Sequence, residues 1–583
     1  AAQAFAESRP AAPKHYALLL DRGTDAMLAR INLIRSATTA IDLQTYIFDE
    51  DDAGLLVLDE LVAAARRGVR VRLLMDQLSA LREIDTLARL ATAHANLQVR
   101  LYNPVLGRAR ITYPQYALAA ACCWRSLNQR MHSKLLLVDG AVGIAGGRNY
   151  QDDYYDWDDE YNFRDRDVLV AGPIARAMDE EFAAFWFDRR SVPAERLSDV
   201  ARHLLHEGVP ARQPVRFERP ERAEAMRTQA ADTDAVQRRL ADRALAVGAV
   251  QYISDRPAKH EDDDAHAHAA ASDSLRTLIE SARDEVLLQT PYLVLSRPAQ
   301  QMFRELRRRP APPDVVISTN SLASTDAFIV YALSYKYKRR YLREFGFQIY
   351  EYKPFPLDAP IDLVATGAEL GVPAPAPTPP AARPRRPRPD TRSALDRARY
   401  RHVMREYSAL AYARRRANEP VPLRRAGVRI GLHAKSLVID ERIGVVGTHN
   451  FDPRGDRYNT ESAVVIADAA FARALRESIR RDIAPENSWV IAPRDKPPVL
   501  SGLDYSIGKL FEQLPVFDLW PVRYATSYEF VPGPDCLQPL PPNAPGFRAC
   551  YRPVGDFPEV SVGFKGITTR IFTAFGAGLA PIL

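Results

Sequence analysis

The sequence predicts an α/β fold made of two pseudo-symmetric halves, each a mixed β-sheet flanked by helices, with one active site shared between them. Three observations support this prediction: helical and strand periodicities alternate, the order of elements recurs, and one string of polar residues occurs twice. Alternating helices and strands are typical of a sheet covered by helices. A repeat of this length indicates duplicated domains rather than a solenoid, whose repeats are far shorter.

The first copy of the pattern lies within the first 80 residues. An amphipathic helix is expected at 24–34, followed by a strand at 41–48. A second helix carries its apolar positions at 55–62 and ends at Gly68. The next strand is expected at 69–75.

The second copy repeats this order. A helix is expected at 275–282, a strand at 286–292, a helix ending near Arg308 and a strand at 315–318. The first strand of each copy carries a similar string, Gln44-Thr45-Tyr46 in one and Gln289-Thr290-Pro291-Tyr292 in the other. The similarity strengthens the interpretation of two related halves.

The halves differ in length because the second contains an insertion. Tyr46 and His132 are 86 residues apart, whereas Tyr292 and His433 are 141 apart. The excess coincides with a tract that holds eight prolines between Pro373 and Pro389, with arginines interleaved. Such a tract forms no packed core. It is either a solvated surface excursion or a basic patch drawn to anionic membranes.

These features predict the domain organisation. We expect a first domain at 15–190, a helical connection at 191–250, a second domain at 251–355 and 420–495, a Pro/Arg-rich insertion at 356–419, and an apolar C-terminal tail at 496–583 suited to packing or membrane contact.

The composition is that of a globular protein with an anionic partner. Of the residues, 46% are hydrophobic, and the formal net charge is +6. A mild basic excess suits phospholipid headgroups or nucleic acid and does not choose between them. No apolar run reaches the roughly 18 residues of a membrane span. Because the sequence begins at Ala1 rather than Met, a removed leader or anchor is compatible with it.

The four cysteines do not form a disulfide scaffold. Cys122 and Cys123 lie in an apolar run and are expected only to pack. Cys536 and Cys550 lie in a Pro-rich segment, where a disulfide between them would imply an oxidising compartment. Around His260 several histidines and carboxylates cluster without ordered ligand spacing, so neither a metal nor another cofactor is expected.

The repeated polar string carries the chemistry. It reads His132-Ser133-Lys134, four residues, Asp139, six residues, Gly146-Gly147-Arg148-Asn149, and again His433-Ala434-Lys435, four residues, Asp440, six residues, Gly447-Thr448-His449-Asn450. We expect each His and Lys to share one face of a strand, followed by a turn at the aspartate. Apolar strands at 135–138 and 436–439 would precede return strands at 142–145 and 443–446. Each half then offers an imidazole, an ammonium and an amide around one point.

Two such sets can perform phosphodiester transfer without a metal. Lys134, Asn149, Lys435 and Asn450 are candidates to bind the phosphate oxygens. One imidazole attacks phosphorus, while the other protonates the leaving alcohol and deprotonates the incoming one. This requires both rings to face one another across a single pocket that is open to solvent.

Supporting carboxylates are also predicted. Glu461 and the pair Asp165 and Asp167 can accept a hydrogen bond from each histidine and orient it. Asp139 and Asp440 enter the candidate catalytic set as members of the repeated string, although stabilising the turn is their expected contribution.

Both strings resemble the HKD motifs of the phospholipase D superfamily. Together with "STNSLASTDAFIVYALSYKYKRRYL" and "LHAKSLVIDERIGVVGTHNFDPRGDRYNTES", they are similar to bacterial cardiolipin synthases, in particular the C-type, over about residues 15–495. The resemblance implies two phospholipase D-like domains, phosphatidyl transfer between two phospholipids, and a peripheral site on the bacterial cell membrane. By this pattern His132 is the nucleophile and His433 the acid and base. The sequence departs from it at Arg454-Gly455, where Arg-Ser is usual.

Three reactions remain open for such a site. The first joins phosphatidylglycerol to a second phosphatidylglycerol or to phosphatidylethanolamine, forming cardiolipin. The second is hydrolysis of phospholipid to phosphatidate. The third is cleavage of nucleic acid, which the double motif in one chain disfavours, since nucleases of this superfamily are often short single-motif chains. A lipid-binding scaffold without activity is disfavoured because both sets of catalytic residues are intact.

Overall fold

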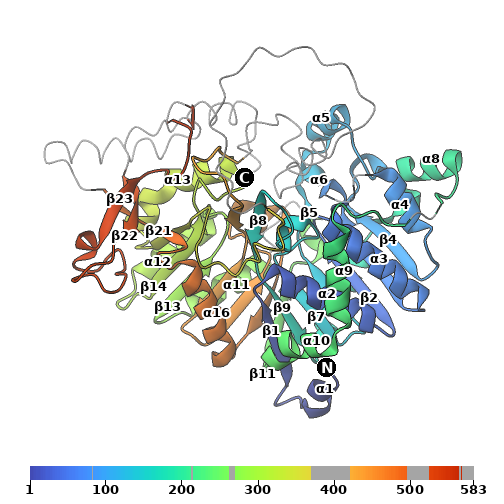
Figure 1. Ribbon diagram of the computed structural model, residues 1–583, viewed down its shortest axis with the longest axis horizontal. Helices are drawn as coiled ribbons and strands as arrows, with labels where there is room; N and C mark the ends of the chain where they lie inside the picture. Colours follow the sequence, from blue (N-terminus) through green and yellow to red (C-terminus); the bar gives the residue numbers. More distant parts are fainter. Residues whose placement is uncertain are drawn as a thin grey trace.

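The computed structural model describes residues 1–79, 81, 83–211, 214–260, 270–368, 420–494, 524–563 and 566–567. Two large sheets lie side by side, with helices covering both of them (Figure 1). Blue to cyan elements of the first half occupy one side, and yellow to red elements of the second half occupy the other (Figure 1).

The first sheet has nine strands in the order β10-β4-β3-β2-β6-β7-β9-β1-β11. Their bounds are β1 His15–Leu20, β2 Ala40–Thr45, β3 Arg70–Asp76, β4 Leu97–Tyr102, β6 Leu135–Val138, β7 Val142–Gly146, β9 Asp167–Ala171, β10 Ser191–Pro193 and β11 Leu245–Val247. Strands β2, β3 and β4 are parallel, whereas β6, β7 and β9 run antiparallel to their neighbours, so the sheet is mixed.

The second sheet has ten strands in the order β12-β20-β18-β17-β13-β14-β15-β21-β22-β23. Their bounds are β12 Val250–Ser254, β13 Glu285–Gln289, β14 Asp314–Asn320, β15 Gln348–Tyr352, β17 Ser436–Ile439, β18 Ile443–Gly447, β20 Ser462–Ile466, β21 Ser488–Pro493, β22 Ala525–Phe530 and β23 Tyr551–Gly555. From β21 to β12 this order repeats the order from β10 to β1, so the duplication that the sequence predicts is present in the topology.

The register of the two sheets also repeats. Gln44 pairs with Leu135 in the first sheet, and Gln289 pairs with Ser436 in the second. Each partner lies three residues beyond a motif histidine, so the two Gln-Thr strings occupy equivalent positions. The mixed α/β fold class predicted from the sequence is confirmed.

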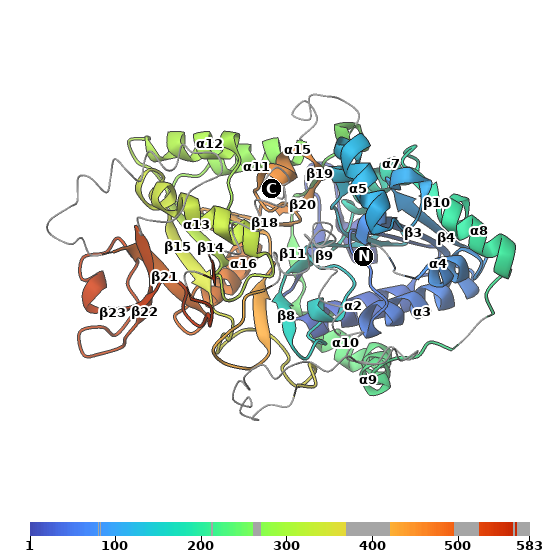
Figure 2. The same ribbon diagram turned by 90° about the horizontal axis from the view of Figure 1, so that it is seen from above.

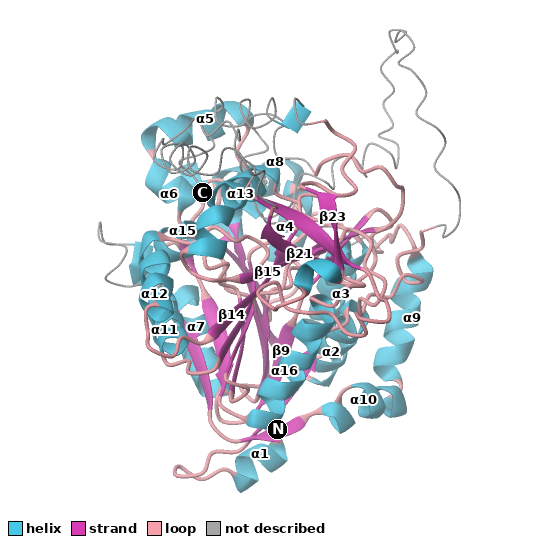
Figure 3. Ribbon diagram, turned by 90° about the vertical axis from the view of Figure 1, so that its left-hand side faces the viewer, coloured by secondary structure: helices cyan, strands magenta, loops and turns pink. Residues whose placement is uncertain are grey.

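Helices lie on both faces of the sheets. The view from above (Figure 2) and the view coloured by secondary structure (Figure 3) both show this arrangement. The bounds in the first half are α1 Ala2–Glu7, α2 Gly23–Ser36, α3 Asp52–Arg66, α4 Ile84–Ala91, α5 Tyr113–Cys122, α6 Trp124–Asn128, α7 Ala175–Trp186, α8 Ser198–Glu207, α9 Pro220–Ala231 and α10 Thr233–Arg239. In the second half they are α11 Ala270–Glu280, α12 Arg297–Arg307, α13 Phe328–Arg343, α15 Pro453–Arg457 and α16 Ala469–Asp482.

Amphipathic faces explain this packing. Helix α2 buries Met27, Leu28 and Ile31 against the first sheet, and α12 buries Met302, Phe303 and Leu306 against the second. Burying a side chain of this size stabilises the fold by about 1.5–3 kcal/mol.

The C-terminal segment extends the second sheet. Strands β22 and β23 pair beyond β21, and a disulfide joins Cys536 to Cys550. A second disulfide joins Cys122 to Cys123, so the prediction that these two cysteines only pack is wrong. Cys122 is exposed, because the end of α5 lies outside the core. Most of the Pro/Arg-rich tract (369–419) and the final apolar stretch (571–583) lie outside the described residues.

Candidate active site

Two short ladders join the halves at the centre of the molecule. Strand β5 (Arg130–Met131) pairs in parallel with β19 (Asn459–Thr460), and β16 (Arg429–Leu432) pairs in parallel with β8 (Tyr161–Arg164). Figure 1 shows β5 and β8 between the two sheets. In each ladder, a strand that leads into a motif histidine lies beside a strand that leads into a carboxylate of the other half.

The ladders place each histidine on a carboxylate from the opposite half. The Nδ1 of His132 lies 2.8 Å from Oε2 of Glu461. The Nδ1 of His433 lies 2.5 Å from Oδ2 of Asp165. Asp167 has other partners, Arg30 and Arg148, and thus does not orient a histidine. Each half therefore contributes the carboxylate that holds the imidazole of the other.

Both carboxylates are ionised at neutral pH. Burial by itself would raise the pKa of Glu461, but His132 and the hydroxyl of Thr448 lower it to about 2. Burial likewise opposes ionisation of Asp165, yet His433 and Lys435 hold its pKa well below the usual range. An ionised carboxylate only accepts hydrogen bonds, so Nδ1 of each ring must carry the proton. The Nε2 atom is therefore the reactive nitrogen of each imidazole.

The motif lysines lie beside their own histidines. The ammonium of Lys134 donates to the carbonyl of His132 at 2.8 Å, and that of Lys435 donates to the carbonyl of His433 at 2.8 Å. Each bond takes one of the three N–H donors of an ammonium. His and Lys lie in the link between two strands rather than within one strand, because residues 132–134 and 433–435 are not part of the ladders.

The two motif asparagines are held differently. Asn149 accepts from the backbone N–H of Ile47 at 3.1 Å and donates to the hydroxyl of Tyr154 at 2.8 Å. For Asn450, the carbonyl of the backbone accepts from Thr290, while its side-chain Oδ1 is buried without a partner among the described residues.

Asp139 and Asp440 lie away from this site. Asp139 accepts from the backbone N–H groups of residues 38–40, and Asp440 accepts from those of residues 283–285. Each is five residues beyond its lysine, at the far end of a strand and about 16 Å away at roughly 3.3 Å per residue. These bonds lower the pKa of both carboxyls, although burial opposes the shift. The structure therefore places these two members of the candidate catalytic set apart from the histidines, where they fix the start of the neighbouring strand.

The geometry of their turns agrees with a structural role. Asp139 and Gly140 have φ values of 52° and 59°, and Asp440 and Glu441 have 51° and 52°. Two successive positive φ values define the tight hairpin that joins β6 to β7 and β17 to β18. The predicted strands at 135–138 and 436–439 are present with these bounds.

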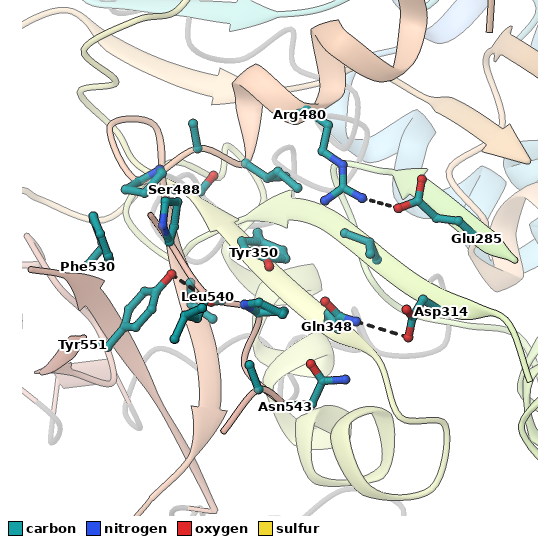
Figure 4. Close-up of a pocket in the computed structure, with 18 residues that line it drawn as sticks. Glu285, Asp314, Gln348, Tyr350, Arg480, Ser488, Phe530, Leu540, Asn543 and Tyr551 are labelled. Carbon is teal, nitrogen blue, oxygen red and sulfur yellow. Dashed lines mark hydrogen bonds and ion pairs between the residues drawn. The ribbon is translucent and has the colours of Figure 1, made fainter. Parts of the chain in front are cut away.

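The expectation of a pocket open to solvent is not met. His132 and His433 are both 0% exposed. The cavity of about 640 Å³ shown in Figure 4 lies elsewhere, between the second sheet, the end of α16 and the C-terminal segment. Tyr350, Gln348 and Arg480 line it, and none of the candidate site residues does.

A buried ionic network supports the His433 side of the site. Arg166 is fully buried and donates to Asp21, Gln289, Ser436 and Ser478. Because these partners come from both halves, the network fixes the two sheets against one another directly behind Asp165. Sequence reasoning missed this arginine and also Tyr154, and the only signal for either is its place within the stretch that follows the first motif.

Comparisons with known proteins find relatives of one kind. A family model described as cardiolipin synthase, PLD-like domain, matches residues 30–186 and 392–483. Cardiolipin synthase C of Escherichia coli is 28% identical over 78% of this chain and 82% of its own length. An uncharacterised protein of Helicobacter pylori is 27% identical over 83% of this chain and 82% of its own length.

Solved structures include a phosphatidylserine synthase of Haemophilus influenzae, with a TM-score of 0.48 and 14% identity over 80% of this chain and 86% of that one. The two stretches matched by the family model contain His132 and His433, one in each half. The chain is similar to bacterial cardiolipin synthases of the C-type, and its two matched stretches resemble the phospholipase D-like domain of that family.

Proposed function

We propose that this protein is a phosphatidyltransferase that joins two phospholipids into cardiolipin through a covalent phosphatidyl-histidine. The observation that carries the proposal is the pair of histidines, each held through Nδ1 by an ionised carboxylate of the opposite half. This arrangement supplies two reactive Nε2 atoms, one for a nucleophile and one for an acid and base.

In the first step, Nε2 of His132 attacks the phosphorus of phosphatidylglycerol. The bond from phosphorus to the headgroup oxygen breaks, and protonated His433 gives its Nε2 proton to that oxygen. Lys134, Lys435, Asn149 and Asn450 hold the two non-bridging oxygens. The products of this step are free glycerol and phosphatidyl-His132.

In the second step, His433 takes the proton of a headgroup hydroxyl on the acceptor lipid. The deprotonated oxygen attacks phosphorus, and the bond from phosphorus to His132 breaks. Cardiolipin leaves, while His132 is again neutral and His433 again protonated. With phosphatidylethanolamine as the donor, the first step would release ethanolamine, and a headgroup hydroxyl of phosphatidylglycerol would attack the phosphorus in the second step.

Burial of the histidines sets a condition on the proposed reaction. Both residues are 0% exposed, so neither lipid nor bulk water reaches the rings in this state. Because the mechanism requires an accessible pocket, this closed state is not the one that reacts. Entry of lipid therefore requires movement of the surrounding residues.

We further propose that the protein works peripherally on the bacterial membrane. In the part of the chain that the structure describes, each helix is too short or too polar to span a bilayer. The basic net charge of +6 suits an anionic surface. The disulfide between Cys536 and Cys550 favours the oxidising, periplasmic side.

The test uses the purified chain with vesicles of phosphatidylglycerol, alone or with phosphatidylethanolamine, and with labelled DNA as a separate substrate. Mass spectrometry should identify cardiolipin. Both His132→Ala and His433→Ala should abolish it, while His203→Ala, a control outside the site, should retain it. Rapid quenching of the wild-type reaction in denaturant at neutral to mildly alkaline pH, where the phosphorus–nitrogen bond survives, should trap a phosphatidyl group on the peptide that contains His132.

Other products would contradict the proposal. Phosphatidate as the sole product would establish hydrolysis, and cleaved DNA with intact lipid would establish a nuclease. A phosphatidyl group on the His433 peptide of the quenched wild-type enzyme, with none on the His132 peptide, would reverse the assigned roles.

A further inference from the structure

Tyr154 lies at the junction of the two catalytic sets. It ends the short helix Asp152–Tyr154 and is 0% exposed. Its ring centroid lies 5.1 Å from that of His433 at an interplanar angle of 83°, and 4.7 Å from that of Phe163. The phenol is thus fixed by packing with its hydroxyl inside the site.

The direction of the hydrogen bonds around Tyr154 follows from its neighbours. The backbone N–H of Ile47 donates to Oδ1 of Asn149, which fixes the orientation of that amide. The amide nitrogen of Asn149 must then donate to the oxygen of Tyr154, at 2.8 Å. The hydroxyl of Tyr154 lies 3.5 Å from Nε2 of His433 and can donate to it when that nitrogen is unprotonated. This distance is long, as catalytic hydrogen bonds often are before substrate binds.

Nε2 of His433 is able to accept this bond. Its Nδ1 carries the proton that is donated to Asp165. The ammonium of Lys435 also lies against the ring, 2.8 Å from Nε2 and 3.0 Å from Nδ1. The imidazole therefore has a carboxylate, an ammonium and a phenol among its neighbours, and the phenol links it to Asn149 of the opposite half.

The segment after the second motif has no tyrosine at the equivalent position. Tyr154 lies five residues after Asn149, and the residue with the same spacing after Asn450 is Gly455. The Oδ1 atom of Asn450 also lacks a hydrogen-bond partner among the described residues. On the His132 side the neighbouring phenol is instead that of Tyr46, which precedes the motif and whose ring centroid lies 5.2 Å from that of His132.

We propose that Tyr154 is a positioning residue that couples phosphate binding by Asn149 to proton transfer at His433. This inference rests on the proposed function and adds Tyr154 to the residues that support it. The hydroxyl directs the second N–H of Asn149 toward the phosphate. After the first step has left His433 neutral, the hydroxyl also donates to Nε2 and keeps it as an acceptor until the acceptor alcohol arrives.

The test compares Tyr154→Phe with a matched control, Tyr155→Phe. Tyr155 is the next residue, is equally buried, and its hydroxyl makes no hydrogen bond among the described residues. Cardiolipin formation on phosphatidylglycerol vesicles should fall about 10- to 100-fold in kcat for Tyr154→Phe, with KM within about threefold, because loss of a hydrogen bond near a charge is typically this large. Tyr155→Phe should match the wild type.

A second readout does not depend on activity. The imidazole of His433 should be titrated by NMR, with its signal assigned from the spectrum of His433→Gln. A donated O–H bond stabilises the neutral ring, so removing it should move the midpoint of this titration to higher pH in Tyr154→Phe and leave it unchanged in Tyr155→Phe. The corresponding limb of the pH–rate profile should move in the same direction.

The two proposals fail differently. An absence of cardiolipin with wild-type protein would overturn the proposed function, while the titration would still decide whether Tyr154 contacts His433. A folded Tyr154→Phe variant with an unchanged titration midpoint would overturn the assignment of Tyr154. So would a loss of kcat that Tyr155→Phe shares to the same extent.

Discussion

The carboxylate that orients each histidine is held in place by a different group on the two sides of the site. On the His132 side, the hydroxyl of Thr448 donates to Glu461 at 2.5 Å. On the His433 side, the equivalent position is Gly147, where a Cβ would collide with the carboxylate of Asp165. The backbone N–H of Arg166 holds Asp165 instead, at 2.7 Å. A longer carboxylate is held by a side chain, whereas a shorter one is held by backbone and needs a glycine beside it.

The two sheets also differ in what packs on equivalent positions of their parallel strands. Arg72 and Val316 occupy equivalent register positions, as do Arg100 and Tyr350. In the first sheet the arginines stack on Trp186, with Arg100 at 4.6 Å from the ring centroid. In the second sheet the corresponding space is part of the cavity in Figure 4, which the C-terminal segment encloses. Duplication therefore preserved the strand order, while the packing on this face diverged.

Neutralising the carboxylate that orients each histidine should have the largest effect on activity. An amide at either position presents an N–H to Nδ1 and forces the wrong tautomer. We expect Asp165→Asn and Glu461→Gln each to reduce kcat by about 10³- to 10⁴-fold. Initial rates on phosphatidylglycerol vesicles measure this, with the exposed Asp234→Asn as control. If either variant keeps more than a tenth of the wild-type rate, its carboxylate does not set the tautomer.

A methyl group at Gly147 should have the next largest effect. Gly147→Ala pushes Asp165 away from His433, and a misplacement of this kind costs about 100-fold in kcat. Circular dichroism should show that the variant remains folded. A normal rate would mean that Asp165 moves without consequence for catalysis.

Thr448→Val should have a smaller effect, because the side chain keeps its volume and loses only the hydrogen bonds of its hydroxyl. Losing the bond to the ionised Glu461 should reduce kcat by about 10- to 30-fold. Thr448→Ser should return the rate to within about twofold of the wild type. Equal rates for the Val and Ser variants would show that the hydroxyl does not support Glu461.

Asp139→Ala and Asp440→Ala should leave kcat unchanged within about twofold and lower Tm by a few degrees, an effect about the size of a lost helix cap. The pKa of Asp139 in the folded protein lies below its ordinary value of 3.8. Its stabilisation is therefore complete above that value and is lost as the pH falls through the lower folded pKa. Thermal melts should show the difference in Tm from wild type shrinking below about pH 4. A large loss of kcat at neutral pH would return these residues to the catalytic set.

Local sequence was sufficient for much of the fold. The strands around each hairpin are short apolar runs bounded by a turn, so their bounds at 135–138 and 436–439 follow from pattern alone. The turn aspartates were recognisable for the same reason. Boundaries were less certain where no turn residue marks them, as at β2, which ends at Thr45 rather than near residue 48.

The sequence by itself determined that the chain is duplicated and that His, Lys and Asn recur with one spacing, because these are properties of consecutive residues. Only the tertiary structure decided which carboxylate holds which histidine. That choice depends on the pairing of β5 with β19 and of β8 with β16 between the two halves. It joins residues far apart in the chain: His132 and Glu461 are separated by 329 positions, and His433 and Asp165 by 268. The tertiary structure also decided the burial of His132 and His433 and the contact of Tyr154 with His433. Packing between distant segments leaves no periodic signal in a single sequence.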